Sequence, residues 1–362
     1  MNDRTVPRHE GRLLDPGMSM GTDPRIDPRL RQVMIEYGLA DNPPPLTVSR
    51  SGNKDEIIAV VKGAHEAFNG FYEALPNDLP GDTDIPFTQH EVTGVNGNSI
   101  IVRVYREPST AATAPGVIYY HGGGMTVLDA FSKVHTRWTQ DLAASGMVAI
   151  VVEFRNAWTE ERLNPFPAGL NDCLSAAKWV SDRRADLGIS KLILQGESGG
   201  GNLALATALK ALSEGCIDII DGVYACVPYI SGAYAWSRDD KLSVLPSLVE
   251  NDGYFLEMTQ TDVVSEMYDP GGRNLGNPLC WPCFAEASAL RGLPPHVISV
   301  NELDPLRDEG IHYYRQLLRA GVQARGRVNL GMAHAAEMIF RKYVPDVYFA
   351  TIRDIADFSR SV

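Results

Sequence analysis

Apolar and polar residues follow two different periods along this chain, one typical of helices and one typical of strands. Between Asp55 and Leu75 the apolar residues recur at helical spacing, which predicts an amphipathic helix. From residue 88 onward, short apolar runs of strand length alternate with longer helical patterns. The predicted strands are 88–95, 99–106, 116–120, 147–152, 191–195, 223–227, 296–301 and 324–329, and the predicted helices are 133–145, 168–187, 202–212, 308–320, 335–342 and 348–359. The turn Asn96-Gly97 joins the first two strands into a hairpin, and the alternation that follows predicts an α/β fold with a mostly parallel sheet flanked by helices.

Two segments break this alternation. Residues 1–50 are rich in Pro, Gly and charged residues, and we expect a loosely packed arm there. Residues 228–278 place aromatic side chains among polar ones, and we expect a helical insertion that packs with the N-terminal helix as a lid. The chain therefore divides into an N-terminal arm with part of a cap (1–87), a first part of the core (88–227), a cap insertion (228–278) and a second part of the core (279–362).

Composition and charge exclude several classes of protein. Of the 362 residues 44% are apolar and 22% are charged, as in an ordinary globular protein. The 45 acidic and 33 basic residues give a net charge of −12, and a nucleic-acid partner would require a basic surface, so none is expected. No run of 18 apolar residues is present and the first residues lack an apolar signal core, so no membrane partner is expected. Five scattered cysteines suit a reducing, cytoplasmic setting. The oligomeric state stays open, a homo-oligomer included.

The central motif is Gly196-Glu197-Ser198-Gly199-Gly200, a G-x-S-x-G that follows a predicted strand and opens a predicted helix. A serine at such a sharp turn needs small flanking residues, and its hydroxyl stands at a helix N-terminus that favours developing negative charge. The pentapeptide alone is weak evidence for a nucleophile, because residues 17–21 also fit the G-x-S-x-G pattern. No predicted strand precedes residues 17–21, however, so that second match is rejected. The alternative for Ser198 is a plain glycine-rich turn; the surrounding elements favour a nucleophile.

A second glycine-rich segment, His121-Gly122-Gly123-Gly124, follows the predicted strand 116–120. Consecutive glycines let backbone N–H groups point at one spot, where they can hold the oxyanion of a tetrahedral intermediate. A flexible loop or a phosphate cradle is the alternative, but the chain lacks the G-x-x-x-x-G-K-[ST] pattern of a phosphate loop.

A serine nucleophile needs a base, and the base needs a carboxylate partner. Asp304 and His334 each follow a predicted strand, so both lie at the sheet edge where Ser198 lies. Their order, Ser198, Asp304, His334, is the order of α/β-hydrolases. Asp308 is a rival acid, but it begins a helix and is expected to cap it; Glu302 is a weaker rival.

On these motifs the chain resembles the hormone-sensitive lipase family of α/β-hydrolases. The residues that carry the resemblance are 121–124, 154–157, 196–202, 304–310 and His334. The resemblance implies an α/β-hydrolase fold with a helical cap, Ser198 as nucleophile, His334 as general base and Asp304 as its partner. It also implies an oxyanion hole made by the amides of Gly123, Gly124 and Gly199. The residues expected to support the site are His121, Gly122, Gly196, Glu197 and Gly200. The common family motif has Asp before the serine and Ala after it, where this chain has Glu197 and Gly199.

We therefore predict a serine carboxylesterase that acts on small-molecule esters of short to medium acyl chains, with macrocyclic lactones as a further class. Tyr229 and Trp236 are candidates for the substrate pocket. The alternatives are a non-catalytic small-molecule receptor on the same fold, and an amide or thioester hydrolase. No cofactor or metal is expected, because no H-E-x-x-H occurs and the spacing of Cys280 and Cys283 is interpreted as incidental.

Overall fold

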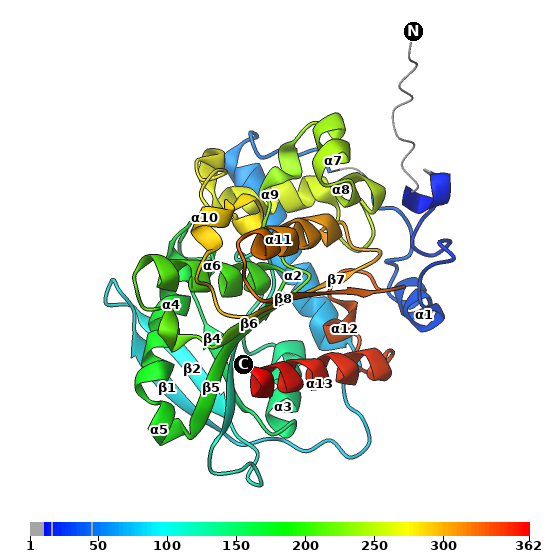
Figure 1. Ribbon diagram of the computed structural model, residues 1–362. Helices are drawn as coiled ribbons and strands as arrows, with labels where there is room; N and C mark the ends of the chain where they lie inside the picture. The colour runs from blue at the N-terminus through cyan, green and yellow to red at the C-terminus, as the bar shows by residue number, and fades with distance from the viewer. Residues whose placement is uncertain (1–10, 16, 45) are drawn as a thin grey trace.

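The computed structural model describes residues 11–15, 17–44 and 46–362, and a single sheet organises this part of the chain (Figure 1). Its eight strands run in the order β1-β2-β4-β3-β5-β6-β7-β8. They are β1 (Phe87–Thr93), β2 (Ser99–Tyr105), β3 (Ala114–Tyr120), β4 (Val148–Glu153), β5 (Ile189–Glu197), β6 (Gly222–Cys226), β7 (His296–Asn301) and β8 (Ala324–Asn329). The pairs β1/β2 and β2/β4 are antiparallel, and all other pairs are parallel. The predicted α/β fold class is confirmed.

The hydrophobic pattern explains which strands lie inside the sheet. In β6 and β7 every residue is buried, as continuous apolar runs predict for strands covered on both faces. The edge strand β1 is mostly exposed, and Val92 is its one buried residue. It is joined to β2 through Asn96-Gly97, and Gly97 adopts a φ of +73° that a tight hairpin turn requires.

Helices cover both faces of the sheet. On one face lie α3 (Lys133–Ala144) and α13 (Pro345–Ser361), and on the other lie α4 (Ala168–Asp182), α6 (Gly199–Ser213) and α11 (Arg307–Arg319). Figure 1 shows α11 and α13 on opposite sides of β8. The short elements in or beside the core are α5 (Arg184–Leu187), α10 (Ala287–Leu290), α12 (Ala336–Ile339) and the 3₁₀ turns at Ile217–Ile219 and Pro282–Phe284.

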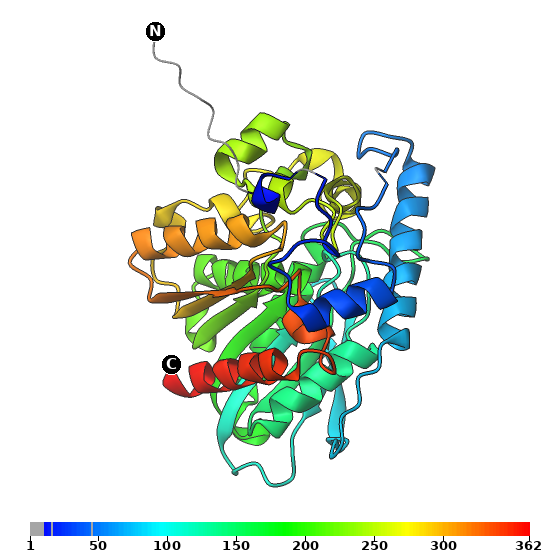
Figure 2. The same cartoon turned by 90° about the vertical axis from the view of Figure 1, so that its right-hand side faces the viewer.

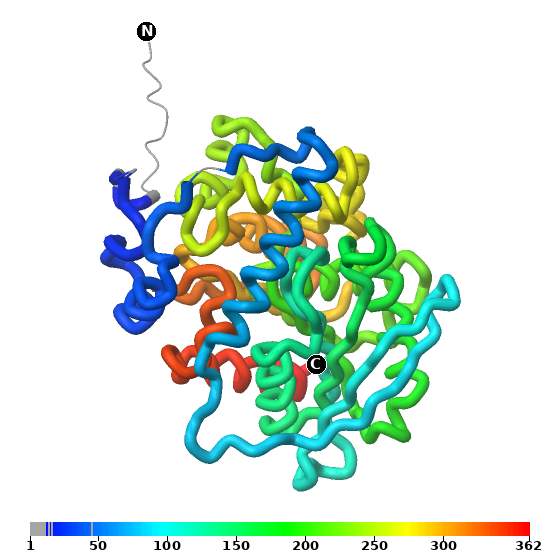
Figure 3. Tube along the Cα trace, turned by 180° about the vertical axis from the view of Figure 1, so that it is seen from behind, coloured from blue at the N-terminus to red at the C-terminus, as the bar shows by residue number. Residues whose placement is uncertain are grey.

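Two segments far apart in the sequence meet above the sheet. The first contains a 3₁₀ turn (Gly11–Leu14), α1 (Pro28–Glu36) and α2 (Lys54–Ala74). The second contains α7 (Arg238–Val244), α8 (Ser247–Glu250), α9 (Met258–Tyr268) and 3₁₀ turns at Ala233–Ala235 and Pro270–Gly272. Figures 2 and 3 show the long blue helix α2 beside the yellow-green α9. Arg50, just before α2, forms ion pairs with Asp262 and Glu266 of α9 at 3.2 and 2.9 Å.

Three local predictions are wrong. The described part of residues 1–50 is not loosely packed, because Ile26, Leu30 and Val33 are fully buried; its first ten residues lie outside the described part. Ile26 lies alone between Pro24 and Pro28, and Pro28 at the first position of α1 begins the helix that carries Leu30 and Val33. The predicted helix 168–187 is divided at Arg183 into α4 and α5, and the predicted helix 335–342 contains only the short α12. Within the described residues, no helix has both the length and the apolar character needed to cross a bilayer.

Candidate active site

Ser198 occupies a strained turn between β5 and α6. Its φ of +55° and ψ of −119° are rare for a residue other than glycine, and such strain is typical of functional sites. The turn is possible only because the flanking residues are small. A Cβ at Gly196 would lie 2.3 Å from the carbonyl of Gly200, and one at Gly200 would lie 1.9 Å from the carbonyl of Tyr120. The Ser198 N–H donates to Cys226 O at 3.0 Å, which fixes the turn to the neighbouring strand.

The segment His121–Gly124 follows β3 and lies against this turn. Gly123 has a φ of +97°, and a Cβ there would lie 2.0 Å from the Val127 carbonyl, so only glycine fits. A Cβ at Gly199 would lie 2.7 Å from the nitrogen of Gly124, which places the two segments in contact. In the described part of the chain, no hydrogen bond uses the N–H of Gly123, Gly124 or Gly199. These three amides are therefore free to donate to a ligand.

Asp304 and His334 are brought together from two loops at the carboxyl edge of the sheet. The Nδ1–H of His334 donates to Oδ2 of Asp304 at 2.8 Å, and Asp304 is fully buried. The other oxygen of Asp304 accepts the Leu306 N–H at 2.8 Å. Asn251, from the insertion, donates to the Asp304 carbonyl at 3.1 Å and so holds the acidic loop in place. Ser198 and His334 share no hydrogen bond in this structure, but both line one pocket.

The two rival acids have other partners. Glu302 accepts the Gly331 N–H at 2.9 Å. Asp308 was expected to cap its own helix, and this prediction is wrong, because α11 begins one residue earlier and has Leu306 as its N-cap. The Asp308 carboxylate instead accepts the N–H of Ser247 at 2.7 Å, at the start of α8. A single helix-start residue cannot be assigned from sequence when the boundary itself is uncertain by one position.

The side chains of His121 and Glu197 support the segment His121–Gly124, which we call the glycine loop. The Nδ1–H of His121 donates to Gly122 O at 2.7 Å, and its ring stacks on Phe154 with a centroid distance of 4.3 Å. Burial lowers the pKa of His121 well below its usual value, so the ring is neutral. Glu197 Oε1 accepts the Gly122 N–H at 2.5 Å and the Tyr119 hydroxyl at 3.1 Å. Burial raises the pKa of Glu197 to about 8.

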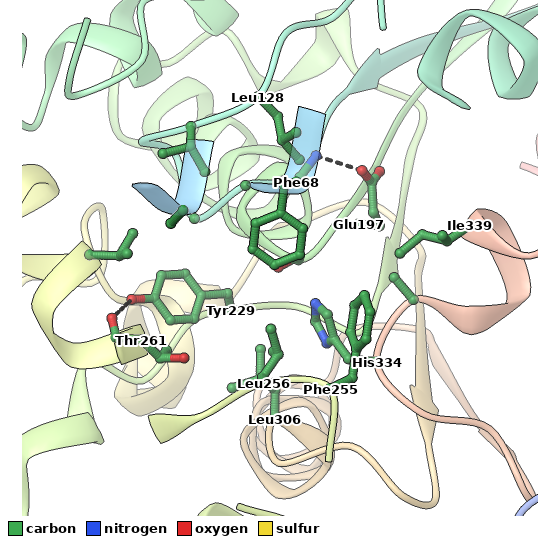
Figure 4. A pocket seen from close by; sticks show the side chains of 18 of the residues that line it. Phe68, Leu128, Glu197, Tyr229, Phe255, Leu256, Thr261, Leu306, His334 and Ile339 are labelled. Atoms are coloured by element: carbon green, nitrogen blue, oxygen red, sulfur yellow. Dashed lines mark hydrogen bonds between the residues drawn. The ribbon is translucent and has the colours of Figure 1, made fainter. Parts of the chain in front are cut away.

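A pocket opens in front of Ser198 and is shown in Figure 4. It holds about 720 Å³ of space between atoms, including the part open to solvent. Its floor is the glycine loop with Ser198 and His334, and its roof comes from α2 and from the insertion. The walls are mainly apolar. The lining residues that the sequence did not assign to the pocket are Ala64, Phe68, Tyr72, Val127, Leu128, Phe255, Leu256, Gln260, Thr261, Val264, Leu306, Ala335 and Ile339. One indication of these lining residues was available from the sequence: Ala64, Phe68 and Tyr72 share a face of the predicted helix 55–75.

The two pocket candidates differ in their positions. Tyr229 lines the pocket, and its hydroxyl donates to the Thr261 carbonyl at 3.0 Å (Figure 4). Trp236 does not line it: its ring stacks on Phe284 with a centroid distance of 5.4 Å, so its predicted place in the pocket is corrected. Cys280 and Cys283 carry buried, free thiols. Within the described residues, no three His, Cys, Asp or Glu side chains are grouped as metal ligands would be.

A mostly parallel sheet, a serine on a strained strand–helix turn and an Asp–His pair at the same sheet edge define the α/β-hydrolase class. Residues 117–338 match the family model described as alpha/beta hydrolase fold, and the chain belongs to this family. It is 47% identical to brefeldin A esterase, a bacterial homologue of human hormone-sensitive lipase; the match covers 96% of this chain and 97% of that one, with a TM-score of 0.94.

Two further relatives agree with this result. The carboxylesterase NlhH of Mycobacterium tuberculosis is 32% identical over 282 residues, which cover 76% of this chain and 82% of the relative. The esterase Est22 is 36% identical with a TM-score of 0.82, covering 95% of this chain and all of the other. The resemblance to the hormone-sensitive lipase family is thus confirmed.

Proposed function

We propose that this protein is a carboxylic ester hydrolase in which Ser198 is the nucleophile, His334 the general base and Asp304 the partner of the base. One observation carries this proposal. The strained turn presents Ser198 in the same pocket as His334, and the far nitrogen of that imidazole is bound to the buried Asp304 at 2.8 Å. The esterases to which the chain is similar support ester hydrolysis as the reaction.

Each group has a defined part in the reaction. The bond to Asp304 keeps the proton of His334 on Nδ1, so Nε2 is free to take the proton of Ser198. The serine oxygen then attacks the ester carbonyl, and the oxyanion that forms accepts hydrogen bonds from the amides of Gly123, Gly124 and Gly199. His334 returns the proton to the leaving alcohol. Water, deprotonated by the same imidazole, then attacks the acyl-enzyme and releases the acid.

The pocket favours an uncharged ester with an apolar body. Its roof and walls present aromatic and aliphatic side chains, and Tyr229, one of its polar groups, already donates its hydroxyl to Thr261. We assign residues 1–87 and 228–278 to a cap, because α2 and α9 supply this roof. Short- to medium-chain esters are the primary substrate class, and the similarity to brefeldin A esterase supports lactones as a second one.

The test is turnover of p-nitrophenyl butyrate by the wild type and by Ser198→Ala. We expect the variant to lose about 10⁶-fold in kcat while keeping its fold by circular dichroism. A phosphonate inhibitor should add its mass to Ser198 in the wild type. A folded variant that keeps turnover, or a phosphonate attached elsewhere, would contradict the proposal. Ester binding without turnover in the wild type would identify a receptor, and faster cleavage of a matched amide would identify an amidase.

A further inference from the structure

The carboxyl group of Glu197 connects the nucleophile turn to the glycine loop. Glu197 is the residue before Ser198, and its Oε1 accepts the N–H of Gly122 at 2.5 Å, as the dashed line in Figure 4 shows. Gly122 precedes the two residues whose amides are free to donate to an oxyanion. The bond therefore fixes where those amides stand relative to the serine, and a shift of about 1 Å in a catalytic group can lower a rate about 10²-fold.

Among the described groups that surround Glu197, none is a cation that could compensate a negative charge on its carboxyl group. The titratable side chains that face it are Tyr72 of α2, Tyr119 of β3, His135 of α3, Cys226 of β6 and Glu337 of α12. His135 Nε2 lies 3.6 Å from Oε1, but burial lowers the pKa of His135 to about 4, so this ring is uncharged at neutral pH. Burial also raises the pKa values of both tyrosines and of Cys226, so these groups stay neutral as well.

The surroundings supply no positive charge among the described groups and contain a further buried carboxyl group, Glu337, and this decides the charge state of Glu197. The side chain is 2% exposed, and its second oxygen, Oε2, is buried without a hydrogen-bond partner among the described groups. An ionised carboxylate in such a place loses its hydration without compensation, whereas a protonated carboxyl group still accepts through Oε1. A negative charge here would also repel the oxyanion that forms beside the next residue, in surroundings that screen charge poorly.

We propose that Glu197 is a positioning residue that works in its neutral, protonated form. It holds the Gly122 peptide, and through that peptide the glycine loop, without placing a negative charge beside the reacting centre. This inference rests on the proposed function, because it concerns the same oxyanion hole. It explains why a carboxyl side chain can stand next to a nucleophile whose reaction generates negative charge.

Two substitutions separate the parts of this proposal. Glu197→Gln is an isostere of the protonated acid, since its amide oxygen accepts the same two hydrogen bonds. We expect it to keep kcat within about fivefold of the wild type at pH 7, because the bond to Gly122 is retained. Glu197→Ala removes the acceptor, and we expect its kcat to fall about 10²-fold, with KM little changed. Activity is measured with p-nitrophenyl butyrate, and circular dichroism at each pH reports the folded fraction.

The pH profile gives the sharper readout. We expect wild-type kcat to fall as the pH rises through about 8, where Glu197 ionises. In Glu197→Gln this alkaline limb should be absent, so that the variant exceeds the wild type at pH 9.5. A merely structural role would change the melting temperature of both variants but would leave the pH profile of the folded enzyme unaltered.

Glu309 provides a matched control. It is 1% exposed, accepts one backbone N–H and one tyrosine hydroxyl, and has a pKa raised to about 8 by burial, yet it does not line the pocket. Glu309→Gln should keep the wild-type alkaline limb of kcat.

Four results would overturn the inference. They are wild-type kcat in Glu197→Ala, equal damage in Glu197→Gln and Glu197→Ala, an unchanged alkaline limb in Glu197→Gln, and loss of that limb in Glu309→Gln. Each can occur while Ser198→Ala is inactive, so the inference can fail while the proposed function stands. Turnover by Ser198→Ala would instead overturn the proposed function itself.

Discussion

Glu309 also allows a prediction about stability. This residue of α11 is buried, and its Oε2 accepts the Ile230 N–H at 3.1 Å and the Tyr234 hydroxyl at 3.2 Å. Burial raises its pKa to about 8 in the folded protein, from the ordinary value of 4.5 that it has in the unfolded chain. Between these two values the folded state holds a proton that the unfolded state has lost. Stability therefore falls as the pH rises through this window.

The size of the effect follows from the two pKa values. At 1.36 kcal/mol for each pH unit, ionised Glu309 costs the folded state about 5 kcal/mol by pH 9, relative to pH 4. Glu309→Gln keeps the shape and an acceptor oxygen but has no proton to lose. We expect this variant to melt about 5–7 °C above the wild type at pH 9, and only about 3 °C above it at pH 6, where less than half of the cost has accumulated.

The assay is scanning calorimetry of both proteins at the two pH values. Because every other titrating group is common to both proteins, the difference between their melting temperatures isolates position 309. The reasoning is refuted if that difference is the same at pH 6 and pH 9, since an effect of shape or packing would not depend on proton binding.

Four further substitutions test other parts of the structure. Asp304→Asn should lower kcat by about 10⁴-fold at nearly unchanged KM, because the imidazole loses its partner; steady-state kinetics on the folded variant would contradict this if kcat fell less than tenfold. Gly200→Ala should abolish activity and lower the melting temperature, because the added Cβ would lie 1.9 Å from the backbone oxygen of Tyr120. Gly63→Ala, in the middle of α2, should instead stabilise the fold by about 1 kcal/mol, because its added Cβ would meet no heavy atom within 4 Å. Arg341→Met should cost about 3–5 kcal/mol in urea unfolding, because buried Asp141 loses its ion pair at 2.7 Å; an unchanged midpoint would show that the pair contributes little.

The sheet and the loops that follow its strands could be predicted from sequence because both depend on local patterns. Short apolar runs identify the strands, and in a parallel sheet the carboxyl ends share one edge, so Asp304 and His334 were expected near Ser198 without knowledge of any contact. The structure places the Asp304–His334 bond at that edge. The partner of Glu197 could not be predicted, because the bond to Gly122 joins residues 75 positions apart.

The insertion was expected to pack against the N-terminal helix, and α2 and α9 are in contact, but the individual aromatic contacts around the pocket roof could not be predicted from local patterns. Phe255 and Phe340 join the aromatic cluster of α2 only through tertiary packing, and nothing in their own segments indicates it. Trp236 was misplaced because an aromatic side chain looks equally suited to a pocket wall and to a contact with Phe284. The packing of residues 17–44 was misjudged because their Pro and charged residues outweighed the short helical pattern of Leu30, Val33 and Met34.

The pairing of α2 with α9 has a consequence for how the chain is made. Residues 75–257 lie between the two helices, so at about 5–20 residues per second the ribosome completes α9 about 10–40 s after α2. During that interval Phe68 and Phe71 lack Phe255, the ring against which both pack at 6.1 Å in the finished protein. The nascent chain therefore leaves the side of these rings that later meets Phe255 open to water, and we expect this stripe of α2 to favour aggregation while synthesis is incomplete.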